Sequence, residues 1–117
     1  MEFLTDAWAA SLDAALQDVE VDPAVDLTID YRAGDFTHRL VISGGRAQMT
    51  TDVDGNADVR ITADPLVAAA INAGEQSALE AFMEGSVVVG GDLRLVMEHQ
   101  SLLERLGAAF GRDPGLG

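Results

Sequence analysis

The spacing of apolar residues along the chain changes from a helical repeat to a strand repeat and back. From about residue 5 to residue 19, apolar residues such as Trp8 and Leu12 recur every three or four positions, which predicts an amphipathic helix. Pro23 marks the end of that segment and the connection onward. The pattern therefore predicts a helix first and a run of strands after it.

Between residues 26 and 62 the repeat is two, with apolar and polar residues in alternation. Short glycine-containing segments interrupt this alternation after Tyr31, after Ile42 and before Val59. The predicted strands are 27–31, 36–42, 46–52 and 59–61. Alternating strands joined by short turns predict an antiparallel meander with one face in water.

After Ala63 the helical repeat returns, with recognisable start signals. Asp64-Pro65 predicts a capped helix that ends at Gly74, because a carboxylate followed by proline is typical of a helix start. Ser77–Glu80 has the form of a capping box and predicts a short second helix. Val87–Val89 between glycines predicts one more strand, and Asp92 predicts the cap of a long final helix.

These elements predict an α+β fold with a single, mostly antiparallel five-stranded sheet and helices on one face. A length of 117 residues fits one domain with one core. We expect this domain to span residues 1–110 and residues 111–117 to form a flexible tail.

The charge and composition exclude several classes of function. The formal net charge is −13, from 20 acidic and seven basic residues, and all seven basic residues are arginine. A field this negative repels phosphate backbones and anionic lipids, so we expect neither nucleic-acid binding nor strong binding to anionic membranes. There is no cysteine, which excludes disulfides and thiolate chemistry. No signal-peptide pattern and no apolar run of ~18 residues is seen, so we expect a cytoplasmic protein.

Two motifs suggest chemistry only weakly. The spacing Asp52-x-Asp54-x-Asn56 begins like a calcium loop, but the glycine and glutamate that such a loop needs later are absent, which favours a hairpin turn. His38 and His99 have no metal-binding or catalytic partner at the usual spacing. His38 shares a strand face with apolar residues, which favours a structural role over a polar contact to a ligand. We expect no catalytic residues, no metal site, no cofactor and no enzymatic activity.

The stretch Phe82-x-x-Gly85-x-Val87-x-Val89-x-Gly91-Asp92, followed by an apolar helix, resembles the sterol carrier protein type two (SCP2-like) family of lipid-binding domains. The resemblance covers roughly residues 5–108 and implies a hydrophobic cavity between the sheet and the helices. Such a cavity would hold a sterol, a fatty acyl chain or a related lipid. The rival hypothesis is an accessory domain that presents a lipid-like intermediate to a partner enzyme.

The candidate lipid-binding residues are the large apolar side chains of the last two helices. Taken alone, their spacing favours an ordinary core, and the family resemblance favours a cavity lining for the group as a whole. A further open choice is whether the last helix is a movable lid or a fixed part of the core. The candidates are Phe82, Met83, Val96, Met97, Leu103, Leu106 and Phe110. The sequence leaves the lipid, the partner and the oligomeric state undetermined.

Overall fold

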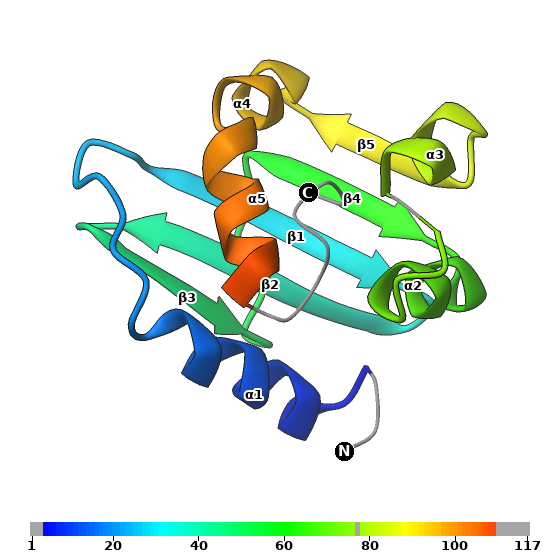
Figure 1. Cartoon of the computed structure of the whole chain (residues 1–117), viewed down its shortest axis with the longest axis horizontal. Coiled ribbons are helices and arrows are strands. Elements are labelled where there is room, and N and C mark those ends of the chain that lie inside the picture. Colours follow the sequence, from blue (N-terminus) through cyan, green and yellow to red (C-terminus); the bar gives the residue numbers. More distant parts are fainter. Residues whose placement is uncertain (1–3, 77, 110–117) are drawn as a thin grey trace.

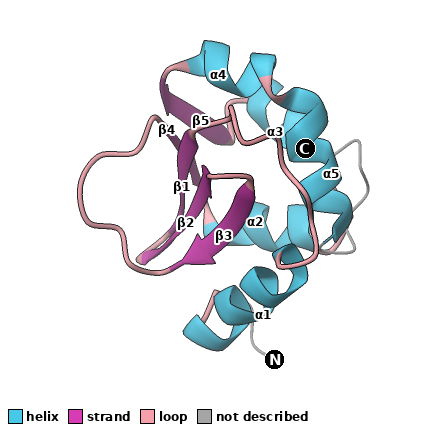
Figure 2. Cartoon of the chain, turned by 90° about the vertical axis from the view of Figure 1, so that its left-hand side faces the viewer, coloured by secondary structure: helices cyan, strands magenta, loops and turns pink. Residues whose placement is uncertain are grey.

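The computed structural model describes residues 4–76 and 78–109, which form one mixed sheet with helices on one side (Figures 1 and 2). The sheet carries the helices α1, α2, α3 and α5 on one face, and a long loop lies against the other face (Figure 2). The elements in order are α1 (Asp6–Leu16), β1 (Leu27–Ala33), β2 (Phe36–Ser43), β3 (Arg46–Thr50), β4 (Val59–Ala63), α2 (Pro65–Asn72), α3 (Ala78–Met83), β5 (Val87–Gly91), α4 (Leu93–Glu98) and α5 (Gln100–Ala109). The predicted α+β class is confirmed.

The strand order is β3-β2-β1-β4-β5, and every neighbouring pair is antiparallel except β1 and β4. The predicted meander is therefore wrong beyond β3. The chain leaves β3, crosses the sheet and places β4 parallel to β1, with Ile29 opposite Val59. The sheet is mostly antiparallel, as predicted, but the segment before β4 is a crossover and not a hairpin turn.

The predicted helix starts before α2 and α4 are confirmed in atomic detail. The Asp64 carboxylate accepts a hydrogen bond from the Leu66 amide at 2.8 Å, and Pro65 occupies the first turn of α2. At the start of α4, the Asp92 carboxylate accepts a hydrogen bond from the Arg94 amide at 3.1 Å. The capping box predicted at Ser77 lies outside the described residues.

The predicted long final helix is broken into two. His99 leaves the helical conformation (φ −109°, ψ 22°), although its amide still donates to the Leu95 carbonyl oxygen at 3.1 Å. The turn lets α4 sit at the end of β5 while α5 crosses the helix-covered face toward α1 (Figure 1). A single straight helix would not cover both places, so the apolar stripe that looked continuous in sequence serves two packing surfaces. The predicted tail at residues 111–117 lies outside the described residues, and so does Phe110.

The core lies between the sheet and the two terminal helical regions. The largest fully buried side chains come from α1, from the middle of the sheet and from α5. They are Leu16, Leu27, Ile29, Leu40, Ile42, Leu106 and Val59. Burial of each such side chain stabilises the fold by roughly 1.5–3 kcal/mol, which makes this cluster the main source of stability.

The other face of the sheet is polar, but Arg39 on it is buried, with 8% of its surface exposed. Its guanidinium donates to both carboxylate oxygens of Asp30, at 2.6 and 3.0 Å. It also donates to the carbonyl oxygens of Val53, Asp54 and Gly55. The segment predicted to be a hairpin turn is thus a loop that closes over this arginine.

The Gly-Asp pair that follows β5 has a backbone requirement. Gly91 has a φ of 85°, and a Cβ there would collide with the carbonyl oxygen of Asp58. The Asp92 amide donates to that same carbonyl oxygen at 3.0 Å. The pair therefore joins the end of β5 to the start of β4 before the chain turns into α4.

Candidate functional site

Near one end of the apolar face of the sheet, one row of large side chains is only partly covered, although Ala33 and Val87 in the next row are buried. Tyr31, Phe36, Ile61 and Val89 share the face that carries the core, but all four are only half-buried. Strand pairing brings three of them into one row, because Tyr31 lies opposite Ile61 and Ile61 lies opposite Val89. This row, together with Phe36, packs against the core without being fully buried, and it is called the open end below.

An aromatic cluster forms the β2 side of the open end. The rings of Tyr31 and His38 stack with centroids 5.1 Å apart, and the edge of Trp8 meets His38 at 4.9 Å. Phe36 contacts both Trp8 and His38, at 6.2 and 5.7 Å between ring centroids. His38 is 7% exposed and has three aromatic neighbours, so the structural role favoured by the sequence agrees with its surroundings.

The candidate lipid-binding residues fall into three groups. Leu103 and Leu106 belong to the buried core, and Val96 packs against it half-buried. Phe82, Met83 and Met97 are 42%, 77% and 69% exposed. The structure therefore does not gather them into one lining, and their part in binding stays a prediction; Phe110 lies outside the described residues.

The burial of side chains on α5 bears on whether the last helix is a movable lid or a fixed part of the core. Leu103 is 9% exposed and Leu106 is 2% exposed, and both are members of the main core cluster. A helix whose side chains fill the core does not open without exposing it to water. These contacts favour α5 as a fixed wall beside the open end.

The sequence pattern missed the open end, although its signal was present. Tyr31, Phe36, Ile61 and Val89 were recognised as apolar strand positions, and each occupies the same side of its strand as the core residues. Period-two alternation identifies the face of a strand but not how far along it a helix reaches. Finding the open end needed the position of α5 on the sheet.

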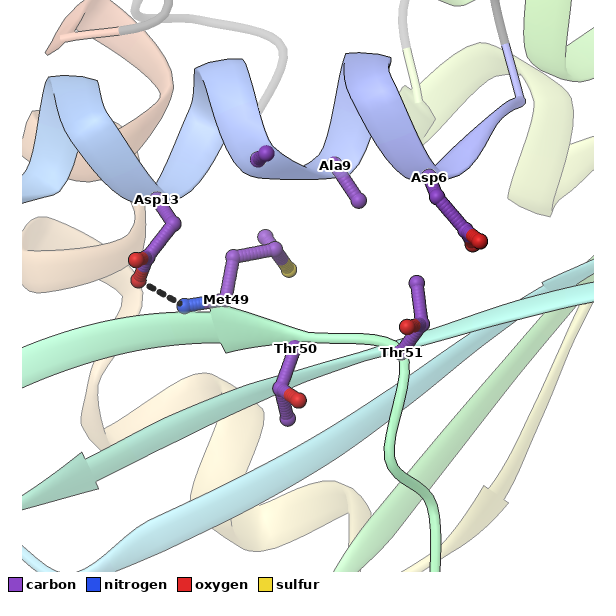
Figure 3. A pocket seen from close by; sticks show the side chains of 7 residues that line it. Asp6, Ala9, Asp13, Met49, Thr50 and Thr51 are labelled. Atoms are coloured by element: carbon purple, nitrogen blue, oxygen red, sulfur yellow. Dashed lines mark hydrogen bonds between the residues drawn. The ribbon is translucent and has the colours of Figure 1, made fainter.

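Two of the hollows on the described part of the chain have no residue of α5 in their lining. One, of about 200 Å³, lies between α1 and β3, where the Asp6 carboxylate lies above Thr51 (Figure 3). There the Asp13 carboxylate accepts a hydrogen bond from the Met49 amide at 2.9 Å and so satisfies a donor of the edge strand. The carboxylates of Asp6 and Asp13 and the hydroxyl of Thr51 make this hollow unsuited to an apolar chain (Figure 3).

Among the described residues there is no group of His, Asp or Glu side chains able to hold a metal ion. In the same residues no helix is long and apolar enough to cross a membrane. Among the described residues, the pKa values that depart from their ordinary range belong to members of ion pairs. The side-chain hydrogen bond from Arg94 lowers the pKa of Asp92, and the corresponding bond to Asp30 raises the pKa of Arg39.

Comparison with known proteins points to one family. The model of the SCP-2 sterol transfer family matches residues 17–104. A crystal structure of sterol carrier protein 2 is similar with a TM-score of 0.73 and 17% identity, over 93% of this chain and 97% of that one. The solution structure of the sterol carrier protein domain 2 of Helicoverpa armigera is similar with a TM-score of 0.61 and 19% identity, over 94% of this chain and 91% of that one. A UbiJ-SCP2 ubiquinone synthesis protein is similar with a TM-score of 0.60 and 18% identity, over 88% of this chain and 92% of that one. No curated protein sequence matches this chain.

Proposed function

Because this chain belongs to the SCP-2 sterol transfer family, we propose that it binds an apolar lipid at the open end of its sheet and carries it without chemical change. The ligand class is a sterol, a fatty acyl chain or a related lipid. The observation that supports the proposal is the half-burial of Tyr31, Phe36, Ile61 and Val89 beside a core that is fully buried on the same face. The cavity predicted from the sequence forms, on this proposal, when the ligand covers these four side chains.

The energetics suit a reversible carrier. Each methylene group removed from water contributes about 0.8 kcal/mol. Binding also costs translational freedom and side-chain order, so an acyl chain covered along part of its length is held with a Kd on the order of micromolar. A carrier needs such an affinity, because it must also release the lipid.

The chain supplies its own reporter for the test. Trp8 is the only tryptophan, and it touches the aromatic cluster at the edge of the open end. A ligand that settles on Tyr31 and Phe36 should change Trp8 fluorescence and raise the melting temperature, because it binds only the folded state. We expect both changes with fatty acids, sterols or isoprenoid quinones. Failure of every ligand in such a panel would contradict the carrier function.

Neighbouring residues of β5 offer a matched pair of variants. Val89 faces the helices at the open end, whereas Val88 is 62% exposed on the opposite face. The added ring in Val89→Phe should occupy ligand space and lower lipid affinity about tenfold or more, by roughly the binding energy of two methylene groups. Val88→Phe makes the same chemical change away from the site and should leave affinity unaltered. Equal effects of the two variants would place the lipid elsewhere.

A second candidate function is an accessory domain that presents a lipid-like intermediate to an enzyme. The similarity to a ubiquinone synthesis protein favours it, as do exposed apolar side chains on α3 and α4. The double variant Met83→Gln, Met97→Gln separates the two functions. A simple carrier should keep its lipid affinity and its activity in the host cell. An accessory domain should keep its lipid affinity but lose activity in the host, because the partner contact is weakened.

A further inference from the structure

A second hollow lies on the polar face of the sheet, on the side away from the proposed lipid site. It has a volume of about 350 Å³, within the range typical of small-molecule sites. Its lining comes from three adjacent strands, β2, β1 and β4. The lining residues are Asp30, Arg32, Thr37, Arg60 and Thr62.

Strand pairing arranges the side chains of this face in two rows. Arg32 of β1 lies opposite Thr37 of β2 and Thr62 of β4, which puts a guanidinium between two hydroxyl groups. One pleat along, Asp30 lies opposite Arg39 on one side and Arg60 on the other. The hollow is therefore bordered by hydrogen-bond donors on three strands, with one carboxylate among them.

That one carboxylate is already neutralised. Both oxygens of Asp30 accept hydrogen bonds from Arg39, so its charge is directed toward β2 and away from β4. Asp52 and Asp54, on the loop over this face, act on Arg39 as well and raise its pKa. Neither Arg32 nor Arg60 forms an ion pair with any residue that the structure describes. Around this face the carboxylates of Asp30, Asp52 and Asp54 accompany three guanidiniums, so the hollow offers guanidinium donors without an ion-pair partner among the described residues rather than a net positive charge.

The Arg60 side chain lies beside its neighbour on β5. That neighbour is Gly90, and a Cβ there would meet the Arg60 Nε atom at 3.7 Å, an ordinary contact distance. Arg32 uses its Nε, which donates to the Gly34 carbonyl oxygen at 3.3 Å, and its terminal nitrogens donate to no residue that the structure describes. Two guanidiniums and two hydroxyls around a hollow match the oxygens of a tetrahedral oxyanion.

We propose that this hollow binds the phosphate or sulfate group of a small molecule. The volume exceeds that of a bare oxyanion, so the ligand carries an organic part as well. A small molecule fits better than an anionic membrane, because the net charge of −13 repels an extended negative surface but acts weakly on one group held at contact distance. The proposal is independent of the lipid function, since the two sites lie on opposite faces of the sheet.

The test measures binding of inorganic phosphate and of glycerol 3-phosphate at constant ionic strength. Sodium chloride replaces each phosphate salt, so that general screening of the negative charge is the same in every sample. We expect ~50 mM phosphate to raise the melting temperature by about 2–5 °C above the chloride reference. Amide resonances of residues 32, 37, 60 and 62 should shift with a common saturation curve.

Three single variants assign the site. Arg32→Gln and Arg60→Gln should each lower phosphate affinity about tenfold, while Arg46→Gln, which removes an equal charge from an exposed position of β3, should not. Both site arginines are exposed, so these variants should fold. Equal losses in all three variants, or no rise above the chloride reference, would overturn the proposal. Co-sedimentation with phosphatidylglycerol vesicles that Arg60→Gln abolishes would replace the small molecule by a lipid head group.

Discussion

Leu27 and Ile29 on β1 are 1% and 0% exposed, whereas Tyr31, one pleat further along the same strand face, is only half-buried. The same contrast appears on β4, where Val59 is 0% exposed and Ile61 is half-buried. Both rows carry large apolar or aromatic side chains. What differs is the cover, since Leu103 and Leu106 of α5, which crosses this face (Figure 1), belong to the same core cluster as Leu27, Ile29 and Val59, called the closed end below. Hydrophobic sequence alone therefore does not tell a core from a site.

This difference separates two tasks that a lipid carrier must combine. The closed end holds the contacts that keep the domain folded, so it tolerates little change in volume. The open end contributes less to folding and keeps its apolar surface available for a ligand. Changes at the closed end should therefore act on stability, and changes at the open end should act on binding.

The largest effect is expected from removal of residues 99–117, which eliminates the helix that covers the closed end. Leu103 and Leu106 leave the core with it, and each contributes roughly 1.5–3 kcal/mol in addition to the core surface they cover. The sum is comparable with the whole stability of a small domain, about 5–15 kcal/mol, so the truncated chain should show no cooperative unfolding transition. A truncated chain that stays folded would instead make α5 a lid.

A matched pair of isoleucines compares the two ends directly. Ile29→Ala removes a fully buried side chain and should lower the free energy of unfolding by about 2–5 kcal/mol. Ile61→Ala makes the same change in the half-buried row and should cost about 1 kcal/mol, because less surface was covered. Lipid affinity should fall only in Ile61→Ala. Urea denaturation and ligand titration measure both, and equal stability losses would remove the distinction between the ends.

Two glycines near the ends of β5, one before the strand and one at its last position, allow a second comparison of a crowded site with an uncrowded one. Gly85 and Gly91 both have positive φ, 81° and 85°, but only Gly91 faces a backbone atom that a Cβ would strike. Gly85→Ala should cost about 1 kcal/mol from conformation alone. Gly91→Ala should cost about 1–3 kcal/mol more, because the Asp58 carbonyl must move. Thermal unfolding measures the difference, and equal melting temperatures would show that the chain relaxes at Gly91 without penalty.

The smallest effect concerns the pH dependence of the α4 cap. Arg94 lowers the pKa of Asp92 below its ordinary value of 3.8, chiefly through their side-chain hydrogen bond. A lowered folded-state pKa contributes stability that is present above pH 3.8 and is lost as the pH falls through the folded value. Asp92→Asn should therefore be less stable than the parent protein at pH 6, and the difference should shrink below pH 4. A difference constant with pH would mean that only the neutral capping bond matters.

Much of the fold was predictable because it depends on local signals. Alternation located the strands, and the Asp64-Pro65 and Asp92 caps located two helix starts. The parallel pairing of β1 with β4 was not predictable, since alternation identifies faces and not neighbours. The break at His99 was hidden because Val96 and Leu103, seven positions apart, continue one helical repeat on both sides of it.

The site was less predictable than the fold. Apolar positions on the final helices looked alike in sequence, yet Leu106 is 2% exposed and Met97 is 69% exposed. The burial of Arg39 on the polar face was likewise not predictable from the sequence. Alternation predicts that it meets water, but the crossover loop folds over it and supplies three carbonyl oxygens. Such burial depends on contacts between segments that only the three-dimensional arrangement brings together.

The parallel pairing of β1 with β4 also bears on how the domain reaches its folded state. The β1–β2 and β2–β3 hairpins have short connections, so they can form early. Docking β4 beside β1 joins residues 30 positions apart, such as Thr28 and Asp58, and must order the intervening loop. Arg39 lies on β2, and its guanidinium donates hydrogen bonds to the carbonyl oxygens of Val53, Asp54 and Gly55 in that loop. We expect these bonds to help order the loop as β4 docks, so replacement of Arg39 should slow refolding as well as speed unfolding.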